Sequence, residues 1–512
     1  MKGGILQDQW SPLVGGEVTR FDRPIRLALF LAWLCLAGWF LSSHVFWRDE
    51  VRAFSFALSG SSIAGMLKAT HGEGHPALWY LILRGLHDLF PYREVLPVAG
   101  AVIGIAAMAL VAWRAPFRVA VIGLILFSFY GAFEYVAISR NYGLAALAMF
   151  GIAALYPRIK GTLWLGVLVA LLCNTNVPSC LLGAMFLLFR FVEMLTDGSR
   201  RGRRDWMVLA GNAMLGLIGA YLCFRMIYPT FNDAAVSSNA SNLGPAALIG
   251  ALVDHKEGFR NLDFGPFLLF IACLGLIRRP AAFCAALGGL IGLKLFFFFI
   301  YPSNYRHEAL YVVFLISLYW MTSEGAGGAL HGPRWIGTVQ RIGCLTFLGL
   351  LVMQTLMLRE PVEMQLSGLP YGRAKDAAEI LKQPALRKAI VMADPDVMLE
   401  TLPYYVDNPL YFMRQQRFGK VAQLSRNARR LLSLDDVVAD ADRLHRTTGR
   451  PIVFMSHLPL PPAGTRRVNM MYHDDTLIDP AGAARFLGST RLVARLRGAG
   501  TDEDYDLYVY PR

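Results

Sequence analysis

The sequence predicts a polytopic α-helical membrane protein with about eleven spans and a C-terminal soluble α/β domain. Hydrophobic residues make up 55% of the 512 residues, charged residues only 17%, and the mean hydropathy is +0.41. Soluble domains carry about 25% charged residues. Windows of about 17–22 apolar residues recur along the chain, and a bilayer core needs about 20 helical residues. After residue 366 the pattern changes to short strands that alternate with amphipathic helices.

Eleven apolar segments have the composition and approximate length of membrane spans. They are 27–46, 95–113, 119–138, 142–156, 161–173, 179–195, 207–228, 264–277, 281–300, 308–322 and 342–358. A further stretch, 75–90, is short and contains Arg84, His87 and Asp88. Its polar residues suit a helix in the membrane interface, so we predict that it does not cross. If it did cross, every later loop would change sides.

Basic residues in the short loops set the predicted orientation. With eleven spans, one end of the helical body collects twelve lysines and arginines, in loops such as 114–118, 157–160 and 199–204. The positive-inside rule places this end in the cytoplasm together with residues 1–26. We therefore predict a multi-pass membrane protein. This topology accounts for the net charge of +13 without a nucleic-acid partner, which we do not expect.

The loops at the opposite, periplasmic end are rich in Asn, His, Arg and acidic residues. The long loop 47–94 follows the first span, and the segments 134–143, 174–179, 229–263 and 301–308 lie on the same side. Ionisable groups that gather at one face of an apolar body point to a functional site there. We therefore expect the active site at the outer face of the membrane.

Residues 367–512 are predicted to form a periplasmic α/β domain that follows the transmembrane domain 27–366. Apolar strand patterns occur at Ala389–Ala393, 450–457, 491–497 and 505–511. Helical patterns precede the first two of these strands. The domain contains no GxGxxG, P-loop or metal-ligand spacing, so we expect a lid or docking role without chemistry of its own.

Two adjacent carboxylates, Asp49 and Glu50, directly follow the first span. A carboxylate at a lipid–water boundary can act as a general base and take a proton from an attacking hydroxyl group. The alternative is that both acids are solvated interfacial residues, paired with Arg48 and Arg52. We favour the catalytic role because the same loop carries further titratable residues.

These further residues are His71, Glu73 and His75 in the segment HGEGHP. Gly72 and Gly74 allow sharp turns, so part of the motif is structural. A structural cap does not explain Glu73 and His75, which we take as substrate-binding candidates. Two histidines and a carboxylate are also suitable ligands for a divalent metal, so a metal site at His71, Glu73 and His75 is an alternative. A site without a metal or other cofactor is the default expectation.

Several side chains near the outer face suit a membrane-embedded phosphate. They are Arg140, Lys294, Arg306 and His307. Arginine offers planar donors to phosphate and lysine offers a point charge. Lys294 lies about two turns inside its span, roughly 9 Å at 1.5 Å per residue, where an ionisable group points to function. Snorkelling to the interface is the competing explanation for Lys294. Tyr142, two residues after Arg140, is a further substrate-binding candidate.

These motifs resemble those of the GT-C superfamily, which are integral membrane glycosyltransferases that use polyprenyl-phosphate-linked sugars. The resemblance rests on the acid pair after the first span and on HPALWY (75–80), EYVAISRNY (134–142) and YRH (305–307). Their order is similar to that in the branch that contains protein O-mannosyltransferases and lipid A aminoarabinose transferases. The motifs look closest to a bacterial subgroup of glycosyltransferase-like membrane proteins, which implies a location in the bacterial inner membrane. The resemblance covers roughly residues 27–358.

The resemblance implies roles for individual residues. The acid after the first span is the catalytic base of the superfamily and corresponds to Asp49, with Glu50 as the adjacent contender. The basic residue before a late span corresponds to Arg306, with His307, as a ligand of the lipid phosphate. Arg140 matches an arginine that contacts phosphate or acceptor. The sequence departs from the mannosyltransferases because it lacks their tandem repeat domain.

The resemblance therefore implies an inverting glycosyltransferase that moves a sugar from a polyprenyl-phosphate donor to an envelope acceptor. That acceptor is a glycan, a lipid or a protein, and membrane lipids are further expected partners. Two other functions stay open. A flippase or exporter of lipid-linked sugars needs charges at mid-depth on several spans, whereas here the polar groups gather at one face. A non-catalytic envelope assembly protein would tolerate replacement of Asp49.

Overall fold

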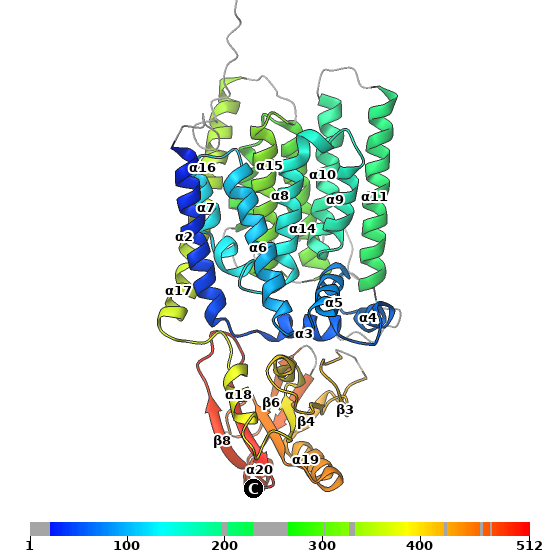
Figure 1. Ribbon diagram of the computed structural model, residues 1–512, viewed down its shortest axis with the longest axis vertical. Helices are drawn as coiled ribbons and strands as arrows, with labels where there is room; N and C mark the ends of the chain where they lie inside the picture. The colour runs from blue at the N-terminus through cyan, green and yellow to red at the C-terminus, as the bar shows by residue number, and fades with distance from the viewer. Residues whose placement is uncertain are drawn as a thin grey trace, which may run out of the picture.

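The chain folds into a body of long helices with a smaller domain of strands and helices at one end (Figure 1). The computed structural model describes residues 21–196, 202–228, 265–301, 303–326, 333–423, 427–460, 464–471 and 474–512. The predicted outer loop 229–263 lies outside these residues. Three short helices, α3 (Arg48–Ala57), α4 (Ile63–Thr70) and α5 (Leu78–Leu89), lie at the end of the body that faces the smaller domain (Figure 1).

Each of the eleven predicted spans contains a helix. The helices of the body are α2 (Asp22–Ser43), α6 (Val95–Arg114), α7 (Val119–Leu126), α8 (Asn141–Ile159), α9 (Trp164–Cys173), α10 (Val177–Thr196), α11 (Arg203–Ile227), α13 (Gly265–Leu274), α14 (Pro280–Phe299), α15 (Tyr305–Ser323) and α16 (Arg334–Met357), which α17 (Arg359–Leu366) extends. Among the described residues, seven helices are long and apolar enough to cross a membrane, with α16 and α17 counted as one. The protein is thus a polytopic α-helical membrane protein.

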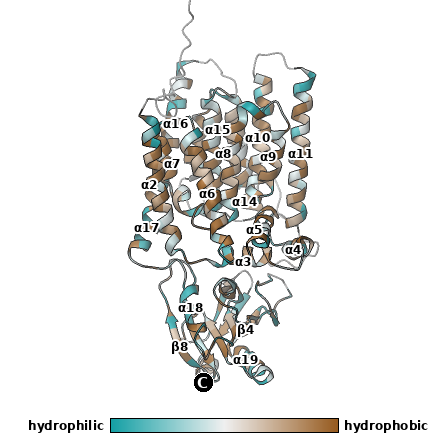
Figure 2. Cartoon of the chain, in the orientation of Figure 1, coloured by the Kyte–Doolittle hydropathy of each residue, from teal (hydrophilic) through white to brown (hydrophobic). Residues whose placement is uncertain are grey.

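The hydropathy of the elements follows their position in the molecule. Apolar residues dominate the long helices, whereas the smaller domain shows a mixture of polar and apolar residues (Figure 2). α15 is buried around its whole circumference from Arg306 to Thr322. A helix that is apolar on every side belongs in a core, and α15 accordingly packs against α8, α14 and α10 inside the body.

The 75–90 stretch contains α5, which has 12 residues. α5 lies with α3 and α4 at the domain end of the body rather than through it (Figure 1). That 75–90 does not cross the membrane stays a prediction. Leu89, Phe90 and Tyr92 at its end are exposed, and such side chains suit the interfacial region of a membrane.

Contacts between loops show which segments share an end of the body. Arg26, near the start of α2, donates to the carbonyl groups of Ala115 at 3.0 Å and Phe117 at 2.8 Å, in the turn between α6 and α7. Lys160, after α8, pairs with Glu193 near the end of α10 at 3.5 Å. These basic segments lie at the end away from the smaller domain. Which side of the membrane this end faces stays a prediction.

The smaller domain contains a four-stranded sheet in the order β1 (Ile390–Asp394), β5 (Ile452–Ser456), β9 (Tyr505–Tyr510) and β8 (Arg491–Leu496). These are the four predicted strands. β1 and β5 run parallel, and the other pairs are antiparallel. Side chains alternate between two cores, since Val391 and Ala393 face one and Ile390 and Met392 face the other.

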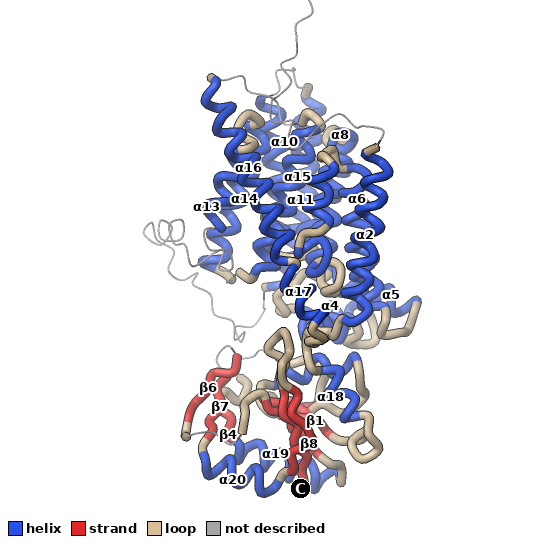
Figure 3. Tube along the Cα trace, turned by 90° about the vertical axis from the view of Figure 1, so that its left-hand side faces the viewer, coloured by secondary structure: helices blue, strands red, loops and turns tan. Residues whose placement is uncertain are grey.

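Helices cover both faces of this sheet. α18 (Ala374–Leu381) and the 3₁₀ segment η3 (Asp396–Tyr404) pack on one face, and α19 (Leu434–Thr448) and α20 (Pro480–Ser489) pack on the other. The face with η3 is turned toward the membrane body, because η3 contacts α3. In the view turned by 90°, the strands of the smaller domain lie below α4 and α5 (Figure 3).

Two further sheets were not expected from the sequence. β4 (Leu431–Ser433), β7 (Asp474–Ile478) and β6 (Arg466–Met471) form one sheet in that order, and β2 (Tyr411–Phe412) pairs with β3 (Arg417–Phe418). β4 and β7 are parallel although about forty residues separate them. The domain is therefore an α/β domain, as predicted, but with more strands.

Candidate active site

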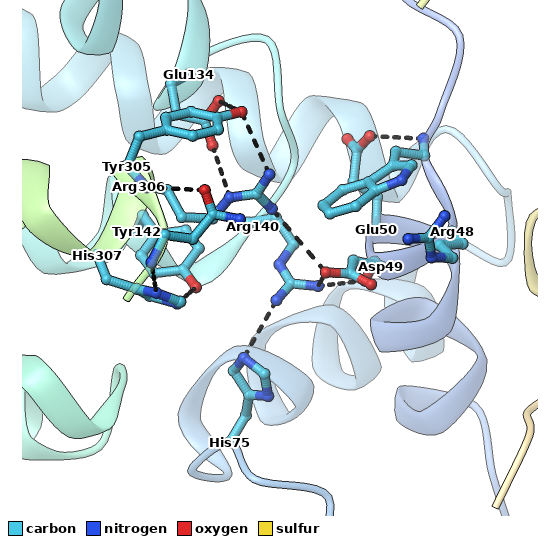
Figure 4. A network of polar contacts seen from close by, with 12 residues as sticks. Arg48, Asp49, Glu50, His75, Glu134, Arg140, Tyr142, Tyr305, Arg306 and His307 are labelled. Atoms are coloured by element: carbon cyan, nitrogen blue, oxygen red, sulfur yellow. Dashed lines mark hydrogen bonds and ion pairs between the residues drawn. The ribbon is translucent and has the colours of Figure 1, made fainter. Parts of the chain in front are cut away.

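Four segments of the chain meet at the domain end of the helical body. They are the start of α3, the loop 135–140 before α8, the start of α15 and the loop 71–77 (Figure 4). A π-helical turn, Tyr130–Glu134, precedes the loop 135–140. Such turns interrupt a regular helix and are frequent at functional sites. The charged side chains of these four segments point toward one another (Figure 4).

Asp49 lies in the first turn of α3, and 31% of its side-chain surface is exposed. Its Oδ2 atom is 3.3 Å from Nη1 of Arg140 and 4.0 Å from Nη1 of Arg306. Burial raises the pKa of Asp49, but the charges of Arg140, Arg306 and Arg48 outweigh burial and hold the pKa below its ordinary value. Asp49 is therefore ionised at neutral pH and still open to a ligand.

Glu50 occupies a different environment, because its side chain is fully buried. Oε1 accepts a hydrogen bond from the backbone N–H of Ser139 at 2.6 Å, and Oε2 accepts one from the backbone N–H of Trp47 at 2.9 Å. His44 Nε2 is 2.8 Å from the same Oε2. Glu50 thus holds the start of α3 against the 135–140 loop, and both of its oxygen atoms are engaged.

Arg306, at the start of α15, is held from several sides (Figure 4). Its Nε atom is 3.4 Å from Oε1 of Glu134, and Nη2 donates to the hydroxyl oxygen of Tyr305 at 3.3 Å. The guanidinium group lies 4.4 Å from the centre of the Trp47 ring, a cation–π contact. The hydroxyl group of Tyr135 donates to the Arg306 carbonyl at 3.0 Å. Planar donors are thus fixed beside Asp49.

His307 is oriented by its two ring nitrogens. The backbone N–H of Asn304 donates to Nδ1 at 3.0 Å, so Nδ1 is the acceptor. Nε2 therefore carries the proton and donates to the hydroxyl oxygen of Tyr142 at 2.8 Å. The hydroxyl hydrogen of Tyr142 remains available to another acceptor. Tyr142 and His307, both predicted site residues, are thus a connected pair.

His75 contacts Arg140 directly. Nη2 of Arg140 donates to Nε2 of His75 at 3.1 Å, because a guanidinium group has no acceptor. Burial and the charge of Arg140 lower the pKa of His75 to about 3. His75 is therefore neutral at physiological pH and uses its free lone pair to fix Arg140.

Asp49, His75 and Arg140 line a pocket at the domain end of the body. Its charged and titratable members are Asp49, Arg52, Glu73, His75 and Arg140. Trp79, Tyr80 and Asn141 also line it. Among the described residues, Nε1 of Trp79 and Oδ1 of Asn141 are buried without a hydrogen-bond partner. The pocket thus combines charged side chains with aromatic walls.

Glu73, the carboxylate of the alternative metal site, is paired with Arg52. Both oxygen atoms of Glu73 bind Arg52, at 2.5 Å from Nε and 2.6 Å from Nη2. In the part of the chain that the structure describes, no three His, Cys, Asp or Glu side chains gather closely enough to hold a metal ion. Arg52 thus already neutralises the carboxylate that the metal alternative at His71, Glu73 and His75 requires, and that alternative stays a prediction.

Lys294 is buried on α14, five residues before the helix ends at Phe299. A role for Lys294 in binding phosphate stays a prediction.

The residues that hold Arg306 were missing from the sequence-based set. Glu134 pairs with Arg306, and Tyr305 and Trp47 contact the same guanidinium group. Glu134 carried a signal, because it is an acid at the end of a predicted span six residues before Arg140. Nothing in the sequence indicated that its partner would be Arg306.

The chain has little detectable similarity to known proteins. No known family and no curated protein matches it. Two crystal structures of ArnT from Cupriavidus metallidurans, one bound to undecaprenyl phosphate and one in the apo state, are each similar at a TM-score of 0.47 and 14% identity. Each comparison covers 94% of this chain and 97% of the other. This similarity is too low to assign a family or an activity.

Proposed function

We propose that the protein is an inverting membrane glycosyltransferase that moves a sugar from a polyprenyl-phosphate-linked donor to a hydroxyl group of a cell-envelope acceptor. The observation that carries the proposal is the open carboxylate of Asp49, which faces Arg140 and Arg306. A base beside two guanidinium groups, at the end of an apolar body, suits transfer from a phosphate that enters from the lipid.

The reaction forms one bond and breaks another. Asp49 takes the proton of the acceptor hydroxyl while that oxygen attacks the anomeric carbon of the donor sugar. The bond from the anomeric carbon to the phosphate oxygen breaks on the opposite face, so the configuration inverts. Polyprenyl phosphate leaves with an additional negative charge, which Arg306 and Arg140 stabilise.

The same arginines connect donor binding with the basicity of Asp49. In the free protein they hold the pKa of Asp49 low although burial raises it, and such a carboxylate is a weak base. A bound phosphate competes for the two guanidinium groups and weakens their interaction with Asp49. The carboxylate thus becomes more basic when the donor is in place.

The other site residues are assigned supporting roles. Glu50 anchors α3, and His75 and Glu73 orient the arginines that they contact. Tyr142 and His307 form a polar wall near Arg306, and Lys294 is a further candidate for the phosphate.

We assign the site and the C-terminal domain to the periplasmic side of the inner membrane. The support is that the basic segments around Arg26, Phe117 and Lys160 lie at the opposite end of the body, which the positive-inside rule places in the cytoplasm.

The test uses purified protein in nanodiscs with a panel of polyprenyl-phosphate sugars and crude envelope acceptors. Release of polyprenyl phosphate is followed for the wild type, Asp49→Asn and Glu50→Gln. Asp88→Asn is the matched control, because Asp88 is an exposed acid at the same end that pairs with Arg84 on α5. We expect Asp49→Asn to abolish release, Glu50→Gln to retain it in the folded fraction, and Asp88→Asn to have no effect.

Two results would contradict the proposal. Equal release by the wild type and Asp49→Asn would move the base to another residue of the pocket, such as Glu73. No release with any donor, together with tight lipid binding, would favour transport of the lipid-linked sugar.

A further inference from the structure

The segment that carries Asp49 lies between the helical body and the C-terminal domain (Figures 1 and 3). Three residues of this segment form hydrogen bonds with the C-terminal domain, to partners more than 340 positions later in the chain. The first is Phe46, whose backbone N–H donates to the hydroxyl group of Tyr405 at 3.0 Å. The ring of Phe46 also packs 4.3 Å from that of Tyr404.

The second position is Arg48, which immediately precedes Asp49. Its guanidinium group binds Asp502 through two hydrogen bonds, at 2.7 Å and 2.9 Å. Its backbone N–H, in the first turn of α3, donates to Oε1 of Glu503 at 2.9 Å. The free N–H groups of a helix start need such acceptors. The C-terminal domain therefore supplies a hydrogen-bond acceptor for the first turn of α3.

The third position is Arg52, three residues after Asp49 and so on the same face of α3. Its Nη1 atom contacts Glu400 of η3 and donates to the carbonyl of Ala422 at 3.0 Å. Its other nitrogens bind Glu73 in the pocket. Arg52 thus joins the pocket wall to the C-terminal domain.

Glu400 and Glu503, the two glutamates of the C-terminal domain that contact α3, are both buried. Glu400 is 1% exposed and Glu503 is fully buried. A Cβ atom at Gly372 would lie 2.6 Å from Oε2 of Glu503, so the chain passes directly against this group. Burial raises the pKa of Glu503 to about 8, which keeps it protonated at neutral pH. Burial of an acidic side chain costs free energy unless hydrogen bonds compensate for the lost water.

We propose that the C-terminal domain is a structural part of the active site, in which Glu503 and Glu400 are positioning residues that hold α3 so that Asp49 faces Arg140 and Arg306. This inference rests on the proposed function for the role of Asp49. The contacts themselves are independent of it. A displacement of about 1 Å at a catalytic group costs about a hundredfold in rate, so loss of these contacts lowers the rate of transfer.

The experiment uses the full chain in nanodiscs and the variants Glu503→Ala and Glu503→Gln. Gln keeps an acceptor for the Arg48 N–H and replaces a protonated carboxyl of the same shape, whereas Ala removes the acceptor. Glu379→Ala is the control, because Glu379 is an exposed acid of the same domain that pairs with Lys382. Asp502→Ala is the second test variant. Its side chain is 51% exposed, so the variant is expected to fold.

Two readouts are compared for each variant. We expect Glu503→Ala and Asp502→Ala to lower kcat for polyprenyl phosphate release at least about tenfold, with KM for the donor unchanged. Amide hydrogen exchange in residues 46–57 should become faster in both. Glu503→Gln should restore kcat and slow exchange, and Glu379→Ala should match the wild type in both readouts.

The exchange measurement separates this inference from the proposed function. If the wild type releases no polyprenyl phosphate but exchange in 46–57 responds as expected, the domain still holds α3 and the proposed function is wrong. Unchanged exchange and unchanged kcat in both Glu503→Ala and Asp502→Ala would overturn the inference.

Discussion

The two ends of the helical body contain the same kind of buried cluster, built from an arginine, a glutamate and a tyrosine. At the end away from the domain, Glu193 Oε2 accepts from Arg190 at 2.7 Å and from the hydroxyl group of Tyr156 at 2.6 Å. All three side chains are buried. These short contacts have the lengths of strong charge-assisted hydrogen bonds.

At the domain end the corresponding side chains are Arg306, Glu134 and Tyr305. Here Nε of Arg306 is 3.4 Å from Oε1 of Glu134, and the Tyr305 hydroxyl is 3.4 Å from Oε2. Within the described residues, neither Nε of Arg306 nor Oε1 of Glu134 has a hydrogen-bond partner. The charges are close enough to attract, but the geometry of a good hydrogen bond is absent.

We attribute the difference to a structural role of the first cluster and to the proposed binding role of the second. Buried polar atoms normally complete their hydrogen bonds within the protein, as those around Glu193 do. Buried donors that lack this completion retain capacity for a ligand, and those around Arg306 adjoin the open carboxylate of Asp49. Because each residue of one cluster has a counterpart in the other, matched substitutions test this comparison directly.

The largest effect is expected for Arg306→Ala compared with Arg190→Ala. Arg306→Ala removes donors that stabilise the leaving phosphate, so kcat/KM should fall about a thousandfold. Arg190→Ala leaves Glu193 buried without its main partner and should lower the free energy of unfolding by about 3 kcal/mol, while the folded fraction transfers sugar normally. Polyprenyl phosphate release and thermal unfolding in nanodiscs measure the two quantities. A similar loss of transfer in both variants would remove the distinction between the clusters.

A smaller effect is expected for Glu134→Gln compared with Glu193→Gln. Glu134 does not touch the substrate in the proposed reaction, but it holds the guanidinium group of Arg306. Loss of a residue that orients a ligand-binding group costs about tenfold or more. We therefore expect kcat/KM to fall about tenfold in Glu134→Gln and to stay unchanged in Glu193→Gln. Initial rates of polyprenyl phosphate release at a series of donor concentrations give kcat/KM for each variant. An unchanged kcat/KM in Glu134→Gln would show that Arg306 does not need Glu134 for its orientation.

A modest effect is expected for Tyr142→Phe compared with Tyr156→Phe. Tyr142→Phe leaves the Nε2–H of His307 without its acceptor, at a cost of about 1–2 kcal/mol for a buried donor. If donor binding restores the contact, KM rises severalfold and kcat changes little. Tyr156→Phe should lower only the unfolding temperature. A wild-type KM in Tyr142→Phe would place the His307 pair outside the donor site.

The fold was largely predictable because its signals are local. A bilayer sets the length and composition of the spans, and the strands at Ile390–Asp394 and Tyr505–Tyr510 are short apolar runs. β4 and β7 were missed because β4 has three residues and its partner lies far along the chain. β6 begins with two arginines and shows no clear alternation. Pairing of this kind depends on tertiary contacts rather than on local propensity.

The candidate site was predictable in its location but not in its contacts. Alternate spans return to the same end, so Asp49, Arg140 and Arg306 could be grouped from topology alone. The sequence did not separate Asp49 from Glu50, because adjacent helical residues point about 100° apart and the rotation of α3 is set by packing. The contacts of Glu503 and Glu400 with α3 cross more than 340 residues, and no spacing rule reaches that far.

The smallest effect is expected from pH, and it tests which group of the site is the base. The pKa of Asp49 lies below its ordinary value, because Arg140, Arg306 and Arg48 outweigh the effect of burial. The base is therefore already deprotonated at pH 5, and kcat/KM, which reports the free enzyme, should be lost only as the pH falls below about 4. Burial and Arg140 lower the pKa of His75 to about 3, so His75 also contributes no inflection near the ordinary histidine value. We expect neither Asp49 nor His75 to give kcat/KM an inflection at about pH 6.5, the ordinary histidine value, in the wild type. Titration at higher pH belongs to Glu503, whose pKa burial raises to about 8. The contrary result is a fall in kcat/KM below about pH 6.5 in the wild type that persists in Asp49→Glu. It would assign the base to a histidine. The loosely paired cluster around Arg306 would then serve binding alone.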